Sequence, residues 1–164
     1  AERHGVTKID VIGDAYFGLC GIPDRDGHAA KAAMFGLEAI RASNRMMACE
    51  AKPELGNISV RFGLASGSVV ASMIGSGNHL KYTLFGDVVN TASRMESTSI
   101  PNRVQCTRET ADLIREQAPN MIEVERRGET EVKGKGKLET FFVNPPKDGF
   151  GDDWGGDGGP GFLI

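Results

Sequence analysis

The stretch "KIDVIGDAY", residues 8–16, constrains the fold more than any other part of the sequence. Ile9, Val11 and Ile12 form a short apolar run, and a second run, "YFGLCGI", follows the Gly-Asp pair at 13–14. Gly-Asp between two apolar runs is typical of a β-hairpin. Burying an unpaired carboxylate costs several kcal/mol, so Asp10 within the first run and Asp14 at its end need a partner or ligand.

The rest of the chain alternates between strand-like and helix-like patterns. We expect helices over residues 27–49, 87–98 and 107–117. We expect strands over residues 7–12, 16–22, 58–67, 103–106, 121–126 and 137–143, with a further short strand at "YTLF". Residues 68–75 fit either a strand or the start of a short helix. This order predicts an α+β fold with an antiparallel or mixed sheet and helices on one face.

Composition excludes several classes of protein. The 164 residues are 40% hydrophobic with a formal net charge of −3, and that charge argues against nucleic-acid binding. The longest apolar runs are too short to span a bilayer, which argues against direct membrane insertion by this chain. The three cysteines form no close pair, which favours a reducing, cytoplasmic setting, although a parent protein could be membrane-anchored. Residues 144–164 are rich in Gly, Asp and Pro, and we interpret them as a disordered tail after a domain at 1–143.

The expected helix at 87–98 carries a polar face. Its members fall at positions i, i+3, i+4 and i+7, and they are Asp87, Asn90, Thr91 and Arg94. An amide and a guanidinium one turn apart can hold a sugar oxygen and a phosphate. A solvated face with an Asp87–Arg94 interaction is an equally good interpretation of this helix alone.

Three lysines alternate with glycines in "RRGETEVKGKGKLETFFV", residues 126–143. Glycine permits close approach of the backbone to a ligand, and lysine is a mobile charge for a phosphate. A Lys/Gly run is more often a solvated hairpin, so this segment alone favours that alternative.

Four segments in order resemble the catalytic domain of class III nucleotide cyclases, above all guanylyl cyclases. They are "KIDVIGDAY", "VRFGLASGSVVASMIG", "YTLFGDVVNTASRMES" and "RRGETEVKGKGKLETFFV", and they cover roughly residues 4–143. The resemblance implies a ferredoxin-like βαββαβ cyclase fold. It also implies conversion of GTP to cyclic GMP and pyrophosphate at a head-to-tail dimer interface, a homodimer or a paired cyclase domain, in intracellular signalling.

The resemblance also implies roles for individual residues. Two divalent metal ions, Mg²⁺ or Mn²⁺, would lie between carboxylates and the triphosphate, with Asp14 as one ligand. Asn90 matches the residue that orients the ribose, and Arg94 the residue that stabilises charge on the α-phosphate. Lys133 matches the phosphate-binding lysine, ahead of Lys135, and Arg61 matches an arginine near the terminal phosphates.

Asp10 and Thr83 match the two positions that read the purine. A carboxylate accepts hydrogen bonds from guanine N1–H and N2–H₂, whereas adenine N1 is itself an acceptor. Guanylyl cyclases usually have Glu and Cys at these positions, and the Thr83 hydroxyl suits either base. GTP is therefore the expected substrate, with ATP and an adenylyl cyclase as the alternative.

The family has a further stretch, of the form "F-x-D-I-x-G-F-T", that precedes the segments matched here. It supplies the other metal carboxylate, and Asp24, Asp26 and Asp87 are poor substitutes for it. We therefore expect an N-terminally truncated domain that is inactive alone. A degenerate half that regulates an active partner is the second alternative. Ala65 and Ser72 also depart from the family, which often has His and Gly there.

Overall fold

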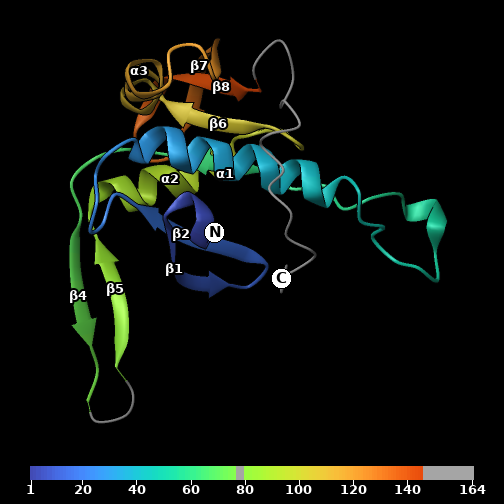
Figure 1. The fold of residues 1–164 in the computed structure, drawn as a ribbon, viewed down its shortest axis with the longest axis horizontal. Coiled ribbons are helices and arrows are strands. Elements are labelled where there is room, and N and C mark those ends of the chain that lie inside the picture. Colours follow the sequence, from blue (N-terminus) through green and yellow to red (C-terminus); the bar gives the residue numbers. More distant parts are fainter. Residues whose placement is uncertain (77–79, 146–164) are drawn as a thin grey trace.

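The computed structural model describes residues 1–76 and 80–145 (Figure 1). Eight strands and three α-helices follow one another along these residues. In chain order they are β1 (Val6–Ile12), β2 (Ala15–Cys20), α1 (His28–Ser43), β3 (Phe62–Leu64), β4 (Val70–Ile74), β5 (Lys81–Phe85), α2 (Asp87–Ser97), β6 (Val104–Thr107), α3 (Arg108–Gln117), β7 (Glu123–Val132) and β8 (Gly136–Asn144). Two short 3₁₀ turns, Glu2–His4 and Pro53–Leu55, complete the described elements.

The strands form one four-stranded sheet and two separate hairpins. The sheet has the order β3-β6-β8-β7, with β3 parallel to β6 and the other neighbours antiparallel. The hairpins are β1-β2, as "KIDVIGDAY" predicts, and β4-β5, which projects from the body of the molecule (Figure 1). Residues 68–75 thus contain a strand, and the α+β class with a mixed sheet is confirmed.

Helices cover both faces of the sheet, which differs from the expected single face. Val104 and Cys106 of β6 belong to the core cluster that α1 and α3 complete. Gln105 lies between them on the opposite face of the strand, where its amide reaches the backbone of α2. The sequence could not show this, because a strand that is buried on both faces has no polar face to mark the solvent side.

Three element lengths also differ from expectation. Helix α1 ends at Ser43, because the chain then turns back and Met47 pairs with Asn57 in an isolated bridge. Strand β3 is limited to three residues, which are those that pair with β6. Strand β7 continues to Val132, since the Lys/Gly segment closes a long β7-β8 hairpin. The tail was expected from residue 144, but Asn144 is the last residue of β8, where it pairs with Glu123 of β7; residues 146–164 of the expected tail lie outside the described residues.

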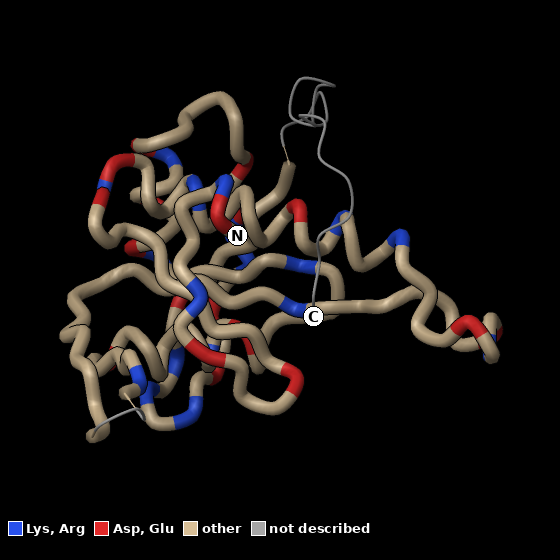
Figure 2. Tube along the Cα trace, turned by 60° about the horizontal axis from the view of Figure 1, so that its bottom comes forward, with Lys and Arg blue, Asp and Glu red and all other residues tan. Residues whose placement is uncertain are grey.

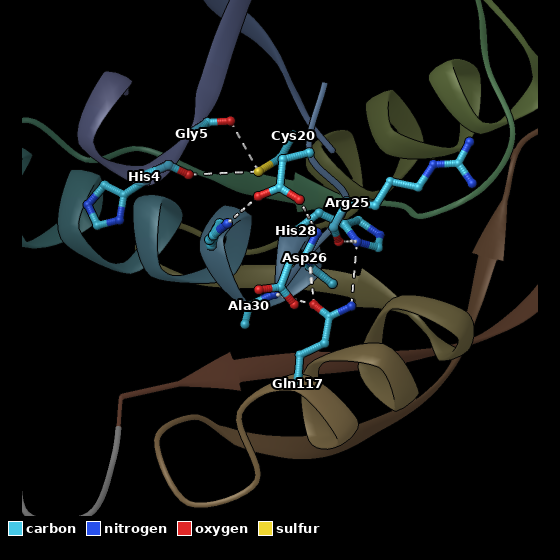
Figure 3. Close-up of polar contacts among 11 residues, drawn as sticks. His4, Gly5, Cys20, Arg25, Asp26, His28, Ala30 and Gln117 are labelled. Carbon is cyan, nitrogen blue, oxygen red and sulfur yellow. Dashed lines mark hydrogen bonds and ion pairs between the residues drawn. The ribbon is translucent and has the colours of Figure 1, made fainter. Parts of the chain in front are cut away.

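The first turn of α1 is completed from another helix. The residue before α1, Gly27, offers no side chain as a cap. The side-chain amide oxygen of Gln117, Oε1, instead accepts from the backbone N–H groups of Ala29, at 2.9 Å, and Ala30, at 3.2 Å (Figure 3). Because the first N–H groups of a helix have no partner within it, this contact joins α3 to the start of α1.

One glycine brings α2 very close to the sheet. A Cβ atom on Gly63 of β3 would lie 2.0 Å from the backbone nitrogen of Glu96 and 2.5 Å from the carbonyl oxygen of Ala92. Both atoms belong to the backbone of α2, so no rotamer change could make room. Gly63 therefore sets the distance between β3 and the helix that carries Asn90 and Arg94.

Candidate functional site

Asp10 is placed by an irregularity in the first hairpin. The β1-β2 register shifts between Lys8 and Asp10, so that Lys8 faces Gly18 and Asp10 faces Phe17. Such a bulge changes the direction in which the following side chain leaves the strand. One Asp10 oxygen accepts from the backbone N–H of Val11 at 2.9 Å.

The second Asp10 oxygen forms an ion pair with a residue from the other hairpin. Lys81 Nζ, at the start of β5, lies 2.7 Å from Asp10 Oδ2. The hydrogen bond from Lys81, followed by that from Val11, lowers the pKa of the Asp10 carboxyl below its ordinary value. The carboxylate within the apolar run is thus paired and ionised.

Thr83 shares a face of β5 with Lys81. The two residues are two positions apart in the strand, and the residue that follows Thr83, Leu84, is buried on the other face. The structure therefore brings a carboxylate and an ammonium together, with a hydroxyl further along the same strand face. Lys81 was missed by the sequence analysis, although its i, i+2 spacing from Thr83 could have indicated it.

Asp14 occupies the tip of the β1-β2 hairpin, directly after Gly13, whose φ is +65°. Its side chain is exposed. Within residues 1–76 and 80–145, no three or more His, Cys, Asp or Glu side chains come together as a metal-binding group. Asp14 can supply one oxygen ligand, but these residues do not by themselves complete a site for a divalent ion.

Asn90 and Arg94 lie one turn apart on α2, as the sequence predicted. Asn90 is exposed and Arg94 is half-buried. The alternative Asp87–Arg94 interaction is not what the structure shows, since the Asp87 carboxylate instead forms an ion pair with Lys135. Within the residues that the structure describes, neither the Asn90 amide nor the Arg94 guanidinium therefore has an ion pair with Asp87 on the same helix.

The two lysines of the β7-β8 turn differ in their surroundings. Lys135 is held against the start of α2 by Asp87, with 22% of its side chain exposed. Lys133 is exposed at the same turn. The ion pair of Lys135 therefore brings the turn that carries Lys133 next to the helix that carries Asn90 and Arg94.

Arg61 lies just before β3, and its guanidinium Nε donates to Glu96 of α2 at 3.0 Å. Both side chains are partly exposed, so the pair adds little stability. Arg61 is therefore joined to α2 near the Gly63 contact, and a phosphate at Arg61 would compete with Glu96.

A pocket of about 500 Å³ lies elsewhere, between the end of α1, the start of β6 and the end of β8. None of the seven predicted site residues lines it.

Lysines, arginines and carboxylates are interspersed along the described chain (Figure 2). Within the described ranges, none of the helices combines the length and apolar character needed to cross a membrane.

The fold and these motifs define a nucleotide cyclase domain, and comparisons with known proteins agree. The chain belongs to the family described as the adenylate and guanylate cyclase catalytic domain, which matches residues 1–145. It is 44% identical over 142 residues to retinal guanylyl cyclase 2 of Bos taurus. That match covers 85% of this chain but only 12% of the relative's length.

Two solved structures share the fold. One is the guanylate cyclase domain of RhGC from Catenaria anguillulae in complex with GTP, at 36% identity and a TM-score of 0.76. It covers 89% of this chain and 76% of that one. The other is the catalytic core of a rhodopsin-guanylyl cyclase with converted specificity in complex with ATPalphaS, at 36% identity and a TM-score of 0.74. It covers 88% of this chain and 74% of that one.

Proposed function

We propose that this domain forms cyclic GMP from GTP as part of a guanylate cyclase. The main observation in favour of guanine over adenine is the Asp10–Lys81 ion pair at 2.7 Å. Asp10 is held as an acceptor-only carboxylate, which suits the N1–H and N2–H₂ donors of guanine. The ammonium of Lys81 and the hydroxyl of Thr83 are donors that suit guanine O6. The identity to a retinal guanylyl cyclase supports the same choice.

In the proposed reaction the ribose 3′-oxygen attacks the α-phosphorus. A new O3′–P bond forms, the bond from the α-phosphorus to the pyrophosphate oxygen breaks, and the 3′-hydroxyl proton is released. Asn90 would orient the ribose, while Arg94, Lys133 and, near the terminal phosphates, Arg61 would oppose the growing negative charge. Such electrostatic stabilisation is usually the largest contribution to catalysis of this kind.

Family membership also implies two divalent metal ions, Mg²⁺ or Mn²⁺. We propose Asp14 as one ligand, because a carboxylate on an exposed turn can reach an ion bound to the triphosphate. The triphosphate oxygens would supply further donors. When bound, the ions would neutralise phosphate charge.

Pairing of two cyclase domains is part of the proposal. The β4-β5 hairpin exposes large apolar side chains: Val70, Met73, Ile74, Leu80 and Phe85, which are 47–66% exposed. Several large exposed apolar side chains on one projecting hairpin favour an association site there. Met73→Asp should therefore lower the dimer fraction in sedimentation, while the matched change Met121→Asp, at an exposed apolar position after α3, should leave the fraction unchanged.

The experiment that tests the function is product identification with the complete natural protein. Mn²⁺ is supplied with GTP or ATP in parallel, and Asp14→Asn is the control. Cyclic GMP that disappears in Asp14→Asn is the expected result. Cyclic AMP as the product would mean that the protein is an adenylate cyclase instead of a guanylate cyclase. The related structure with converted specificity was solved in complex with ATPalphaS, so this fold can hold an adenine nucleotide analogue. A folded protein that makes neither product would favour the alternative that this domain is a degenerate cyclase half that regulates an active partner.

A further inference from the structure

The C-terminal end of α2 rests on a buried amide. Gln105 of β6 is fully buried, with 0% of its surface exposed. Its Nε2 donates to the carbonyl oxygen of Met95 at 3.2 Å and to the hydroxyl of Thr98 at 2.7 Å. Both acceptors belong to the last turn of α2 or to the residue that ends it, where carbonyl groups lack partners within the helix.

The Thr98 hydroxyl links Gln105 to Arg94 by a second hydrogen bond. As it accepts from Gln105, its own proton is free to donate, and Thr98 Oγ1 lies 2.7 Å from the carbonyl oxygen of Arg94. A serine or threonine hydroxyl has one donor and two acceptor positions, so both bonds can exist together. The backbone of Arg94 is thereby joined to Gln105 through one hydroxyl.

Arg127 of β7 fixes the direction of the Gln105 amide. Its guanidinium donates to Gln105 Oε1 and, at 2.7 Å, to the carbonyl oxygen of Thr98, and it lies 5.1 Å from the centre of the Phe142 ring. Because a guanidinium has only donors, the amide oxygen must face Arg127. The amide nitrogen must then face α2.

We infer that Gln105 and Arg127 are positioning residues that set the place of Arg94 in the active site. The inference rests on the proposed function, because Arg94 is the residue assigned to the α-phosphate. Burying an amide in a core costs free energy that an apolar side chain of similar size would not. Here each polar atom of the amide has a partner, so the group specifies one arrangement of α2 on the sheet.

The sharpest test changes the Thr98 hydroxyl, which lies between Gln105 and Arg94 in this series of hydrogen bonds. Thr98→Val removes it with almost no change in shape, and Thr98→Ser keeps it. We expect kcat to fall on the order of tenfold in Thr98→Val, since small misplacements of a reacting group have effects of this size. KM for the triphosphate should change by less than about twofold, because Arg94 is assigned to the transition state rather than to ground-state binding. Thr98→Ser should keep the wild-type kcat.

A matched control separates positioning from loss of stability. Thr140 of β8 is also fully buried and hydrogen-bonded, to the carbonyl oxygen of Gly128 and the hydroxyl of Thr130, with no bond to α2. Thr140→Val should lower the melting temperature and leave kcat unchanged. Equal loss of kcat in Thr140→Val and Thr98→Val, or no loss in Thr98→Val, would overturn the inference.

A second pair of variants tests the other link. Arg127→Lys cannot reach both Gln105 and Thr98 with one ammonium, whereas Arg126→Lys changes a neighbour that binds Glu139 on the exposed side of the hairpin. Only Arg127→Lys should lower kcat in the complete protein.

A readout without activity keeps this inference separate from the proposed function. The amides of Thr98 and Ser99 donate to Arg94 and Glu96 at 3.0 Å, and their hydrogen exchange should accelerate in Thr98→Val and Arg127→Lys. If the wild-type protein forms no cyclic nucleotide, the proposed function fails, and faster exchange still supports the link from β7 to α2. Unchanged exchange in both variants would refute that link.

Discussion

Asp10 and Lys81 join the two hairpins of the molecule through an ion pair at 2.7 Å, between the middle of β1 and the start of β5. The β1 strand supplies the carboxylate and β5 supplies both the ammonium and, two residues later, the Thr83 hydroxyl. The surface that we propose for base recognition is thus assembled from segments about seventy residues apart in the sequence.

The first prediction concerns the titration of Asp10. The hydrogen bond from Lys81 lowers its pKa below the ordinary 3.8, so the stabilisation from this pair is present above that value and is lost as the pH falls through the lower, folded-state pKa. Lys81→Met should raise the pKa of Asp10 towards 3.8. Carboxyl ¹³C NMR measures both values, and an unchanged titration in Lys81→Met would contradict the pairing.

The second prediction concerns the choice of base. Asp10→Lys replaces an acceptor by a donor beside Lys81, which should disfavour guanine and favour adenine, whose N1 accepts. We expect the ratio of kcat/KM for GTP over ATP to fall at least tenfold, corresponding to about 1.4 kcal/mol. Lys8→Asp, a charge change on the same strand, is the control. A GTP preference that survives Asp10→Lys would remove Asp10 from base recognition.

The third prediction separates the two lysines of the β7-β8 turn. Lys133→Met should lower kcat/KM by about 100-fold, the usual cost of removing one group that opposes transition-state charge. Lys135→Met should have a smaller effect, because Lys135 acts on the turn through Asp87. Lys137→Met, on the same hairpin and paired with Glu129 at 3.6 Å, should be close to wild type. Steady-state kinetics on the three variants measures this order, and a larger effect of Lys135→Met would exchange the two roles.

The fourth prediction concerns the contact between β3 and α2. Gly63→Ala places a methyl group within 2.0 Å of the Glu96 nitrogen, so α2 must move and unfolding should become easier by about 3 kcal/mol. Gly67→Ala is the matched control, since its Cβ would meet only the Val88 side chain, at 3.3 Å. Urea unfolding measures both variants. Equal stability of Gly63→Ala and wild type would mean that α2 lies further from β3 than described.

The fifth prediction concerns thiol reactivity. Burial raises the pKa of the Cys106 thiol to about 12, so almost no thiolate exists at pH 8. A thiol reagent should leave Cys106 unmodified in the native protein and modify it after unfolding, as mass spectrometry of the labelled peptides would show. Rapid labelling of native Cys106 would place β6 at the surface.

Local patterns were sufficient for the element types. Gly-Asp between apolar runs predicted the β1-β2 hairpin, and the i, i+3, i+4 spacing predicted α2 with Asn90 and Arg94 on one face. Both features depend on neighbours within a few residues. The end of α1 was predicted too late, because the pairing of Met47 with Asn57 depends on a contact ten residues away.

Pairings between distant segments were decided by the tertiary structure. The i, i+2 spacing puts Lys81 on the strand face of Thr83, but its ion pair with Asp10 is a contact between distant segments. The ion pair of Asp87 with Lys135, instead of Arg94, is another such contact. The burial of the Gln105 amide against α2 could not be predicted either, since one polar residue in a short strand is normally assigned to the solvent face. Short-range geometry therefore determined the elements and the motif residues, whereas packing of α2 on both Gly63 and Gln105 determined where those residues lie. The physical reason is that helix and strand periods are properties of the local backbone, while ion pairs and buried hydrogen bonds between elements exist only once the sheet has brought them together.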